Sequence, residues 1–204
     1  MKVYVETNFV MELVFGQEQS TSCNDIIRFC EQGHAQLAIP AYCLAEPHEK
    51  LIRESRRRAE LQDSLNAELK QLTRSSFHAR RIEQLEDIRA LLVQSSEVEG
   101  QRFASILPEI IAVSQVIPLT AAILTTAVQY EDSRGLGPQD AVVYASILSD
   151  LQDRRPHQAC FLNRNSRDFN GPNIVSELAR FDCRSIWRFD HGLEFIKSQI
   201  QEVI

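Results

Sequence analysis

Short apolar segments recur along this 204-residue chain, and each is separated from the next by a stretch long enough to form helices. Segments of this kind are typical of buried strands, and apolar residues at helical spacing lie in the stretches between them. We predict strands at residues 1–5, 36–40, 113–117, 160–162 and 184–187. Strands that alternate with helices form a parallel sheet covered by helices on both faces, so the sequence predicts an α/β fold.

The first helices are predicted from the residues at their ends. Residues 9–15 are mostly apolar, and Gly16 ends this stretch. Polar residues at 23–25 are expected to cap a second helix, which Gly33 ends. A much longer helix is expected over residues 41–74, where almost no helix-breaking residue occurs.

Residues 50–95 carry two series of apolar residues at helical spacing, flanked by charged residues. The first series is Leu61, Leu65, Leu69 and Leu72, and the second is Ile82, Leu85, Ile88 and Leu92. Two such series predict an antiparallel helix pair, which is an ordinary amphipathic pair, a coiled-coil-like arm or a clamp on the core. We place this helical hairpin as an insertion at residues 50–110 of a single domain spanning residues 1–204.

The composition narrows the functional classes. The formal net charge is −6 and the sequence pI is near 5.4, so the chain as a whole does not attract nucleic acid. This argues against a protein that scans DNA. It leaves a nuclease open, because an acidic metal site and a local basic rim can occur in one protein. The histidines lack the spacing of a zinc site.

The sequence predicts neither a membrane span nor export. The longest apolar stretch, residues 116–128, is too short to cross a bilayer, and the N-terminus lacks the pattern of a signal peptide. The five cysteines form no C-x-x-C pair, so we expect reduced, buried thiols. These features predict a cytoplasmic protein with no membrane partner.

Acidic and polar residues follow several of the predicted strands, where open parallel sheets bind their ligands. Glu6 follows the first strand, Glu46 lies one helical turn after the second, and Asp140 starts a later helix. Asn165 and Asp168 follow the fourth strand. Oxygen ligands that converge from separate elements suit Mg²⁺ or Mn²⁺. Taken singly, each acid is better explained as a helix cap or a solvated surface charge.

Five segments of the chain resemble, in the same order, segments of PIN domains. They are residues 3–9 (VYVETNF), 45–46 (AE), 118–120 (PLT), 138–145 (PQDAVVYA) and 161–169 (FLNRNSRDF). The resemblance covers residues 3 to about 169 and implies a three-layer α/β/α fold with a central parallel sheet. It also implies metal-dependent nuclease chemistry, usually on RNA, in a family that includes the toxins of toxin–antitoxin pairs.

The resemblance assigns roles to residues by their position in these segments. It implies that Glu6, Glu46 and Asp140 are catalytic residues that bind the metal ion, directly or through water. It also implies that Thr7 and Asn8 are supporting polar residues that orient the first of these ligands.

The chain departs from the family pattern at two positions. The first acid is Glu6 where the family usually has Asp, which moves the carboxylate by one methylene. The fourth acid of the family falls at Asn165, whose carbonyl oxygen is able to bind a metal ion but brings no charge. We therefore assign the fourth catalytic and metal-binding role to Asp168, one turn further on, and keep Asn165 as a supporting residue.

Basic residues near these positions are candidate contacts for RNA phosphates. Arg164 and Arg167 flank the proposed site, and Arg53 lies on the helix that starts near Glu46. Phosphate contacts of this kind give binding that is independent of sequence and weakened by salt. The alternative is a solvated surface on which these arginines pair with neighbouring acids.

Two functional hypotheses follow. The first is an endoribonuclease that uses Mg²⁺ or Mn²⁺ to hydrolyse RNA, in the manner of the family's toxins, with an antitoxin or a second copy of the chain as its protein partner. The alternative is a catalytically degraded PIN-like module that uses the helical hairpin to bind a protein partner or a second copy of the chain. Metal affinity separates the two, because a nuclease binds Mn²⁺ through its acids and a degraded module does not.

Overall fold

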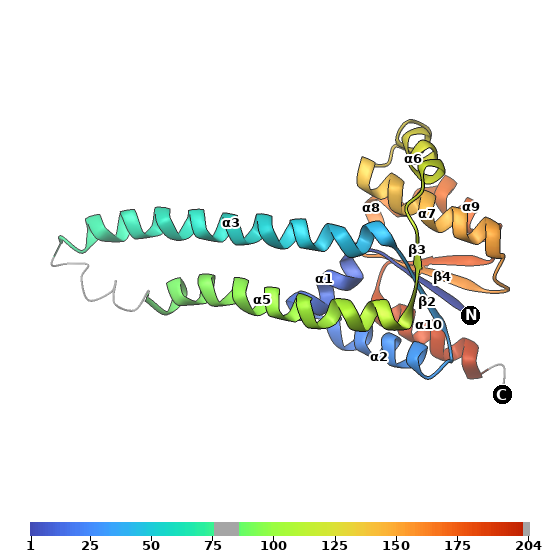
Figure 1. Ribbon diagram of the computed structural model, residues 1–204, viewed down its shortest axis with the longest axis horizontal. Coiled ribbons are helices and arrows are strands. Elements are labelled where there is room, and N and C mark those ends of the chain that lie inside the picture. Colours follow the sequence, from blue (N-terminus) through green and yellow to red (C-terminus); the bar gives the residue numbers. More distant parts are fainter. Residues whose placement is uncertain (76–85, 202–204) are drawn as a thin grey trace. The chain divides into compact units, whose positions relative to one another are not determined.

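The computed structural model describes residues 1–75 and 86–201 of the chain, which divides into two compact units (Figure 1). One unit contains Met1–Pro47 and Ile106–Ile204, and the other is His48–Ser105. We call the first the sheet unit and the second the helical unit.

Five parallel strands form the centre of the sheet unit: β1 (Lys2–Val5), β2 (Gln36–Pro40), β3 (Ser114–Ile117), β4 (Ala159–Leu162) and β5 (Cys183–Ile186). They lie in the order β3-β2-β1-β4-β5, and each pairs in parallel with its neighbours. The predicted strands are confirmed, with ends that differ from the prediction by at most one residue. Because β1 is the central strand, the residues that follow it lie between the ends of β2 and β4.

Helices cover both faces of this sheet (Figure 1). One face carries α1 (Thr7–Phe15), α2 (Ser20–Glu31) and α10 (Phe189–Gln201). The other carries α6 (Ala121–Arg134), α7 (Pro138–Arg154), α8 (Ser166–Phe169) and α9 (Pro172–Ala179). On this second face, the Phe169 and Phe161 rings pack edge-on with centroids 5.1 Å apart. The predicted three-layer α/β/α arrangement with a central parallel sheet is therefore confirmed.

The ends of the first two helices agree with the sequence to different degrees. Gly16, with φ 60°, ends α1 as predicted. The predicted cap at residues 23–25 is wrong, because α2 already begins at Ser20. Gln19, which precedes it, makes no side-chain cap, and its backbone N–H donates to the Glu12 carboxylate at 2.6 Å. A contact with the preceding helix therefore accompanies the start of α2.

Among its described residues, the helical unit consists of two antiparallel helices: α3 (Ala41–Leu72), which begins in the sheet unit, and α5 (Glu86–Val113), which ends there. The Arg58 guanidinium donates two hydrogen bonds to Glu99, at 2.6 and 2.9 Å, and one to Ser96 at 3.3 Å. Closer to the start of α3, the ring centroids of His48 and Phe103 lie 6.0 Å apart. The predicted hairpin of antiparallel helices is present.

The predicted apolar stripes of the hairpin are only partly correct. Three of their residues are buried or half-buried: Leu65, Leu69 and Leu92. Three others are exposed: Leu61, Leu72 and Ile88. Arg58 contacts α5 through Glu99, and Leu69 is buried, whereas Leu61 between them in the sequence is exposed to solvent. The remaining two positions lie outside the described residues: Ile82 and Leu85.

The cysteines are free thiols, and all except the partly exposed Cys30 are buried, as the sequence predicts. In the part of the chain that the structure describes, no helix combines the length and the apolar character needed to cross a bilayer.

Candidate active site

The first predicted acid, Glu6, lies where β1 ends and α1 begins. It is the N-cap residue of α1, and its backbone is extended, with φ −121° and ψ −178°. One carboxylate oxygen accepts the Asn8 N–H at 2.8 Å, and the other accepts the Arg164 N–H at 3.0 Å. Only 5% of Glu6 is exposed, and this burial raises the pKa of its carboxyl to about 7, although the two N–H donors oppose the shift.

The two supporting residues next to Glu6 contact different acids. The buried Thr7 hydroxyl donates to a carboxylate oxygen of Glu46. Thr7 therefore orients Glu46, whereas the sequence predicts that it orients Glu6. Asn8 contacts Glu6, through its backbone N–H. Glu46 is half-buried in α3, on the part of that helix that belongs to the sheet unit.

Asp140 lies in the first turn of α7, after the N-cap residue Gly137. The Asn165 side-chain amide lies 3.2 and 3.3 Å from its two carboxylate oxygens and donates to them. Burial, together with the negative charge of Asp168, raises the pKa of the Asp140 carboxyl to about 6, and the Asn165 amide opposes this rise. Asp168 itself is half-buried in α8.

The structure brings the four predicted acids near one another at the carboxyl edge of the sheet. The charge of Asp140 contributes to the raised pKa of Glu6, and the charges of Asp168 and Glu46 contribute to that of Asp140. These acids come from four elements that are far apart in the sequence. Among residues 1–75 and 86–201, however, no three His, Cys, Asp or Glu side chains are arranged closely enough to hold an ion.

The donor set fits Mg²⁺ or Mn²⁺ by its chemistry. These hard cations prefer carboxylate oxygens, and a bound cation relieves the mutual repulsion of clustered carboxylates. Hydrogen-bond donors supply part of that compensation in the structure. They are N–H groups at Glu6, a hydroxyl at Glu46 and an amide at Asp140.

Comparison of the sequence with known protein families assigns the chain to one of them. The model of the PIN domain family matches residues 3–169, a range that contains all four acids. The chain belongs to the PIN domain family. PIN domains are generally metal-dependent nucleases.

Among solved structures, this PIN domain is similar to the crystal structure of VapBC2 from Rickettsia felis bound to a DNA fragment from their promoter. The two chains share 13% sequence identity, the match covers 91% of this chain and 98% of that chain, and the TM-score is 0.42. Comparison with curated proteins found no match. The family assignment therefore rests on the sequence match to the PIN domain.

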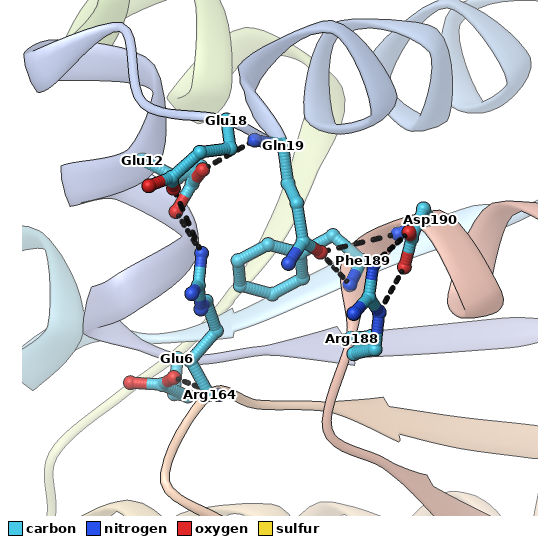
Figure 2. Close-up of polar contacts among 8 residues, drawn as sticks. All are labelled: Glu6, Glu12, Glu18, Gln19, Arg164, Arg188, Phe189 and Asp190. Carbon is cyan, nitrogen blue, oxygen red and sulfur yellow. Dashed lines mark hydrogen bonds and ion pairs between the residues drawn. The ribbon is translucent and has the colours of Figure 1, made fainter.

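The three arginines predicted to contact RNA differ in their surroundings. The Arg164 guanidinium lies 2.8 Å from an oxygen of Glu12 and 3.7 Å from an oxygen of Glu18 (Figure 2). Arg167 is exposed on α8, and Arg53 is exposed on α3 within the helical unit. The charge of Arg164 is thus paired with two acids of the PIN domain itself.

Two polar residues near this site are missed by sequence analysis. Glu12 is 1% exposed and accepts hydrogen bonds from Arg164 and from Gln19. The sequence does indicate Glu12, since it is the single acid within the apolar stretch of residues 9–15. A carboxylate buried in such a stretch needs a charged or hydrogen-bonding partner. Gln19 carries no comparable signal.

The raised pKa values in this PIN domain predict how its stability depends on pH. The folded-state pKa is about 7 for Glu6 and about 6 for Asp140, against ordinary values of 4.5 and 3.8. The folded protein therefore keeps protons that the unfolded chain has released. This contribution to stability is complete below the ordinary values and is lost as the pH rises to about 7.

Without divalent metal, we expect the melting temperature to fall between pH 5 and pH 8, and to fall less in the Glu6→Gln variant than in the parent. Thermal unfolding followed by circular dichroism in EDTA measures both proteins. The difference between them isolates Glu6 from the other titrating groups, and an equal fall in both would contradict the prediction.

Proposed function

We propose that this PIN domain is a Mg²⁺- or Mn²⁺-dependent endoribonuclease that hydrolyses phosphodiester bonds of RNA. The observation that carries the proposal is the cluster of carboxylates from four separate elements, in which burial and like charge raise the pKa of two members. Such clustering costs stability in the metal-free protein, and a cation removes that cost. Perturbed acids gathered at one edge of a sheet are typical of a functional site.

Each acid has a proposed role in the reaction. Glu6, Glu46 and Asp140 bind the cation, and Asp168 takes the fourth position that Asn165 leaves uncharged. When bound, the cation supplies positive charge that polarises the phosphate and makes a water molecule more acidic. Glu6 and Asp140 are ionised above about pH 7, so metal affinity is expected to rise up to that pH.

Neighbouring groups of the chain hold these carboxylates in place before metal binds. Asn8 and Arg164 donate backbone N–H groups to Glu6. The Thr7 hydroxyl donates to Glu46, and the Asn165 side-chain amide donates to Asp140. Donors of this kind orient metal ligands and restrict their movement.

The RNA contacts are assigned to exposed arginines. Arg167 extends from α8, the helix that carries Asp168, and Arg53 extends from α3. Both side chains are exposed, which leaves them accessible to phosphates. Binding through them is expected to weaken as salt is added, because phosphate contacts release counterions.

A degraded PIN module that binds a protein is the second candidate. Two observations favour it: among the described residues no three acids are arranged to hold an ion, and the helical unit exposes large apolar side chains. The exposed residues of that unit are Ile52, Leu61, Leu72, Ile88, Leu91, Val93 and Val98. Exposed apolar surface of this kind often marks a protein interface.

Metal binding and cleavage test the two candidates together. We expect calorimetric titration to detect Mn²⁺ binding, and the protein to cleave labelled single-stranded RNA in Mg²⁺ or Mn²⁺. Cleavage should stop in EDTA and return when metal is added in excess. A Glu6→Gln preparation made in the same way controls for contaminating ribonucleases. No Mn²⁺ binding at millimolar metal would instead support the degraded module.

The protein partner assigned to this nuclease is an antitoxin, as for the toxin members of the PIN family, or a second copy of the chain. We place the reaction in the cytoplasm, where such toxins meet RNA. Measurement of molar mass in solution, for the chain alone and with the product of a small neighbouring gene, separates the two partners.

A further inference from the structure

The turn that follows β4 contacts two of the proposed metal ligands at once. The Arg164 N–H donates to one oxygen of Glu6 at 3.0 Å, and the Asn165 amide lies 3.2 and 3.3 Å from the oxygens of Asp140. Glu6 comes from the end of β1, and Asp140 comes from the first turn of α7. The position of residues 164 and 165 therefore influences two carboxylates that reach the site from different elements.

The Arg164 side chain extends from this turn to α1. Figure 2 shows its guanidinium reaching the Glu12 carboxylate, at 2.8 Å. Glu12 is 1% exposed, and its other oxygen accepts the Gln19 backbone N–H at 2.6 Å. A carboxylate removed from water is costly unless it is paired and hydrogen-bonded, so breaking this contact costs more than breaking a surface ion pair.

Gln19 connects this contact to a third helix. Its side-chain carbonyl accepts the backbone N–H groups of Phe189, at 2.6 Å, and Asp190, at 3.3 Å, where α10 begins (Figure 2). The Phe189 ring packs edge-on against Phe9 of α1, with centroids 5.3 Å apart. Contacts among α1, α2 and α10 thus fix the position of Glu12, which makes it a rigid anchor.

We propose that Arg164 is a positioning residue for the nuclease site, and that buried Glu12 is the anchor that fixes it. The inference rests on the proposed function. It gives Arg164 a role in positioning the acids, whereas the sequence predicts that Arg164 contacts RNA. Through Glu12, the guanidinium holds the turn so that its N–H meets Glu6 and the Asn165 amide meets Asp140. Loss of the anchor frees both carboxylates, and metal affinity falls because the ligands must be ordered on binding.

Glu18 provides a matched control for Glu12. It lies 3.7 Å from the same guanidinium, but its side chain is 82% exposed, whereas that of Glu12 is 1% exposed. An exposed ion pair contributes little to structure. Changing either acid to Gln removes one charge near Arg164 with almost no change in volume, and only the change at Glu12 is expected to alter the site.

The test uses the full chain and four variants: Glu12→Gln, Arg164→Ala, Arg164→Lys and Glu18→Gln. Calorimetry measures the affinity for Mn²⁺, and NMR hydrogen exchange without metal measures the protection of the residue 164 amide. We expect Glu12→Gln and Arg164→Ala to lower Mn²⁺ affinity about 10- to 100-fold and to lose that protection. Arg164→Lys should lie between Arg164→Ala and the parent, because Lys keeps the charge without the forked geometry. Glu18→Gln should match the parent.

Unchanged Mn²⁺ affinity and unchanged exchange in Arg164→Ala would overturn the proposal, and a loss of RNA affinity in that variant would then make Arg164 a phosphate contact. If the parent does not bind Mn²⁺, the proposed nuclease function fails, while hydrogen exchange still decides whether Glu12 and Arg164 hold the turn. If Glu12→Gln does not fold, the two variants at the partly exposed Arg164 decide the question.

Discussion

Changing Glu6 to Gln is expected to abolish Mn²⁺ binding and to reduce RNA cleavage by about 100-fold or more. The amide removes one negative charge from a site whose affinity depends on carboxylates. It also breaks a hydrogen bond, because both Glu6 oxygens accept N–H donors and a Gln side chain places an NH₂ group opposite one of them. Calorimetric titration with Mn²⁺ and cleavage of labelled single-stranded RNA measure the two effects.

Three further variants sharpen this result. Glu6→Asp keeps the charge and shortens the reach, so Mn²⁺ binding should weaken without disappearing. Asp140→Asn should behave like Glu6→Gln and keep its fold, with slightly higher metal-free stability because crowded like charges repel. Glu18→Gln removes a charge from an 82% exposed side chain and serves as the control. Mn²⁺ binding that survives unchanged in Glu6→Gln would exclude Glu6 from the site.

The strands are predictable because a parallel sheet covered on both faces demands short, continuous apolar segments. In β1, Val3, Tyr4 and Val5 are fully buried, and the strand ends at the first acid, Glu6. The start of α2, by contrast, is not predictable from the local sequence. It coincides with a contact between the Gln19 N–H and another helix, and only the folded chain brings these groups together.

The residues of the candidate site are predictable from their places at element ends, but the directions of their side chains are not. Parallel strands that end at one edge bring Glu6 and the residues after β4 together. Spacing along the chain does not say which neighbour a side chain meets. Thr7 therefore contacts Glu46, and the guanidinium of Arg164 turns to Glu12.

A buried ion pair ties β1 to α7 and is also missed by sequence analysis, which assigns Lys2 to a strand without a partner. The Lys2 ammonium contacts Asp150 of α7, which also accepts the Tyr4 hydroxyl at 2.7 Å and the Gln115 amide at 2.9 Å. The pKa of the Asp150 carboxyl lies below its ordinary value. Burial acts to raise this pKa, but the hydrogen bonds from Lys2 and Tyr4 lower it by more. The stability this provides is present above the ordinary pKa and is lost as the pH falls through the lowered one.

Replacing Asp150 by Asn is expected to lower the free energy of unfolding by about 3–5 kcal/mol, because it leaves the Lys2 charge buried without its partner. Arg154→Ala is the control: Arg154 also donates to Asp150, at 2.9 Å, but it is 60% exposed, so its loss should cost less than about 1 kcal/mol. The double variant Lys2→Met with Asp150→Leu removes both charges and should regain most of the loss. Urea denaturation measures all four proteins. A loss below about 1 kcal/mol for Asp150→Asn would mean that the Lys2–Asp150 pair does not hold β1, which leads to Glu6, against α7, which carries Asp140.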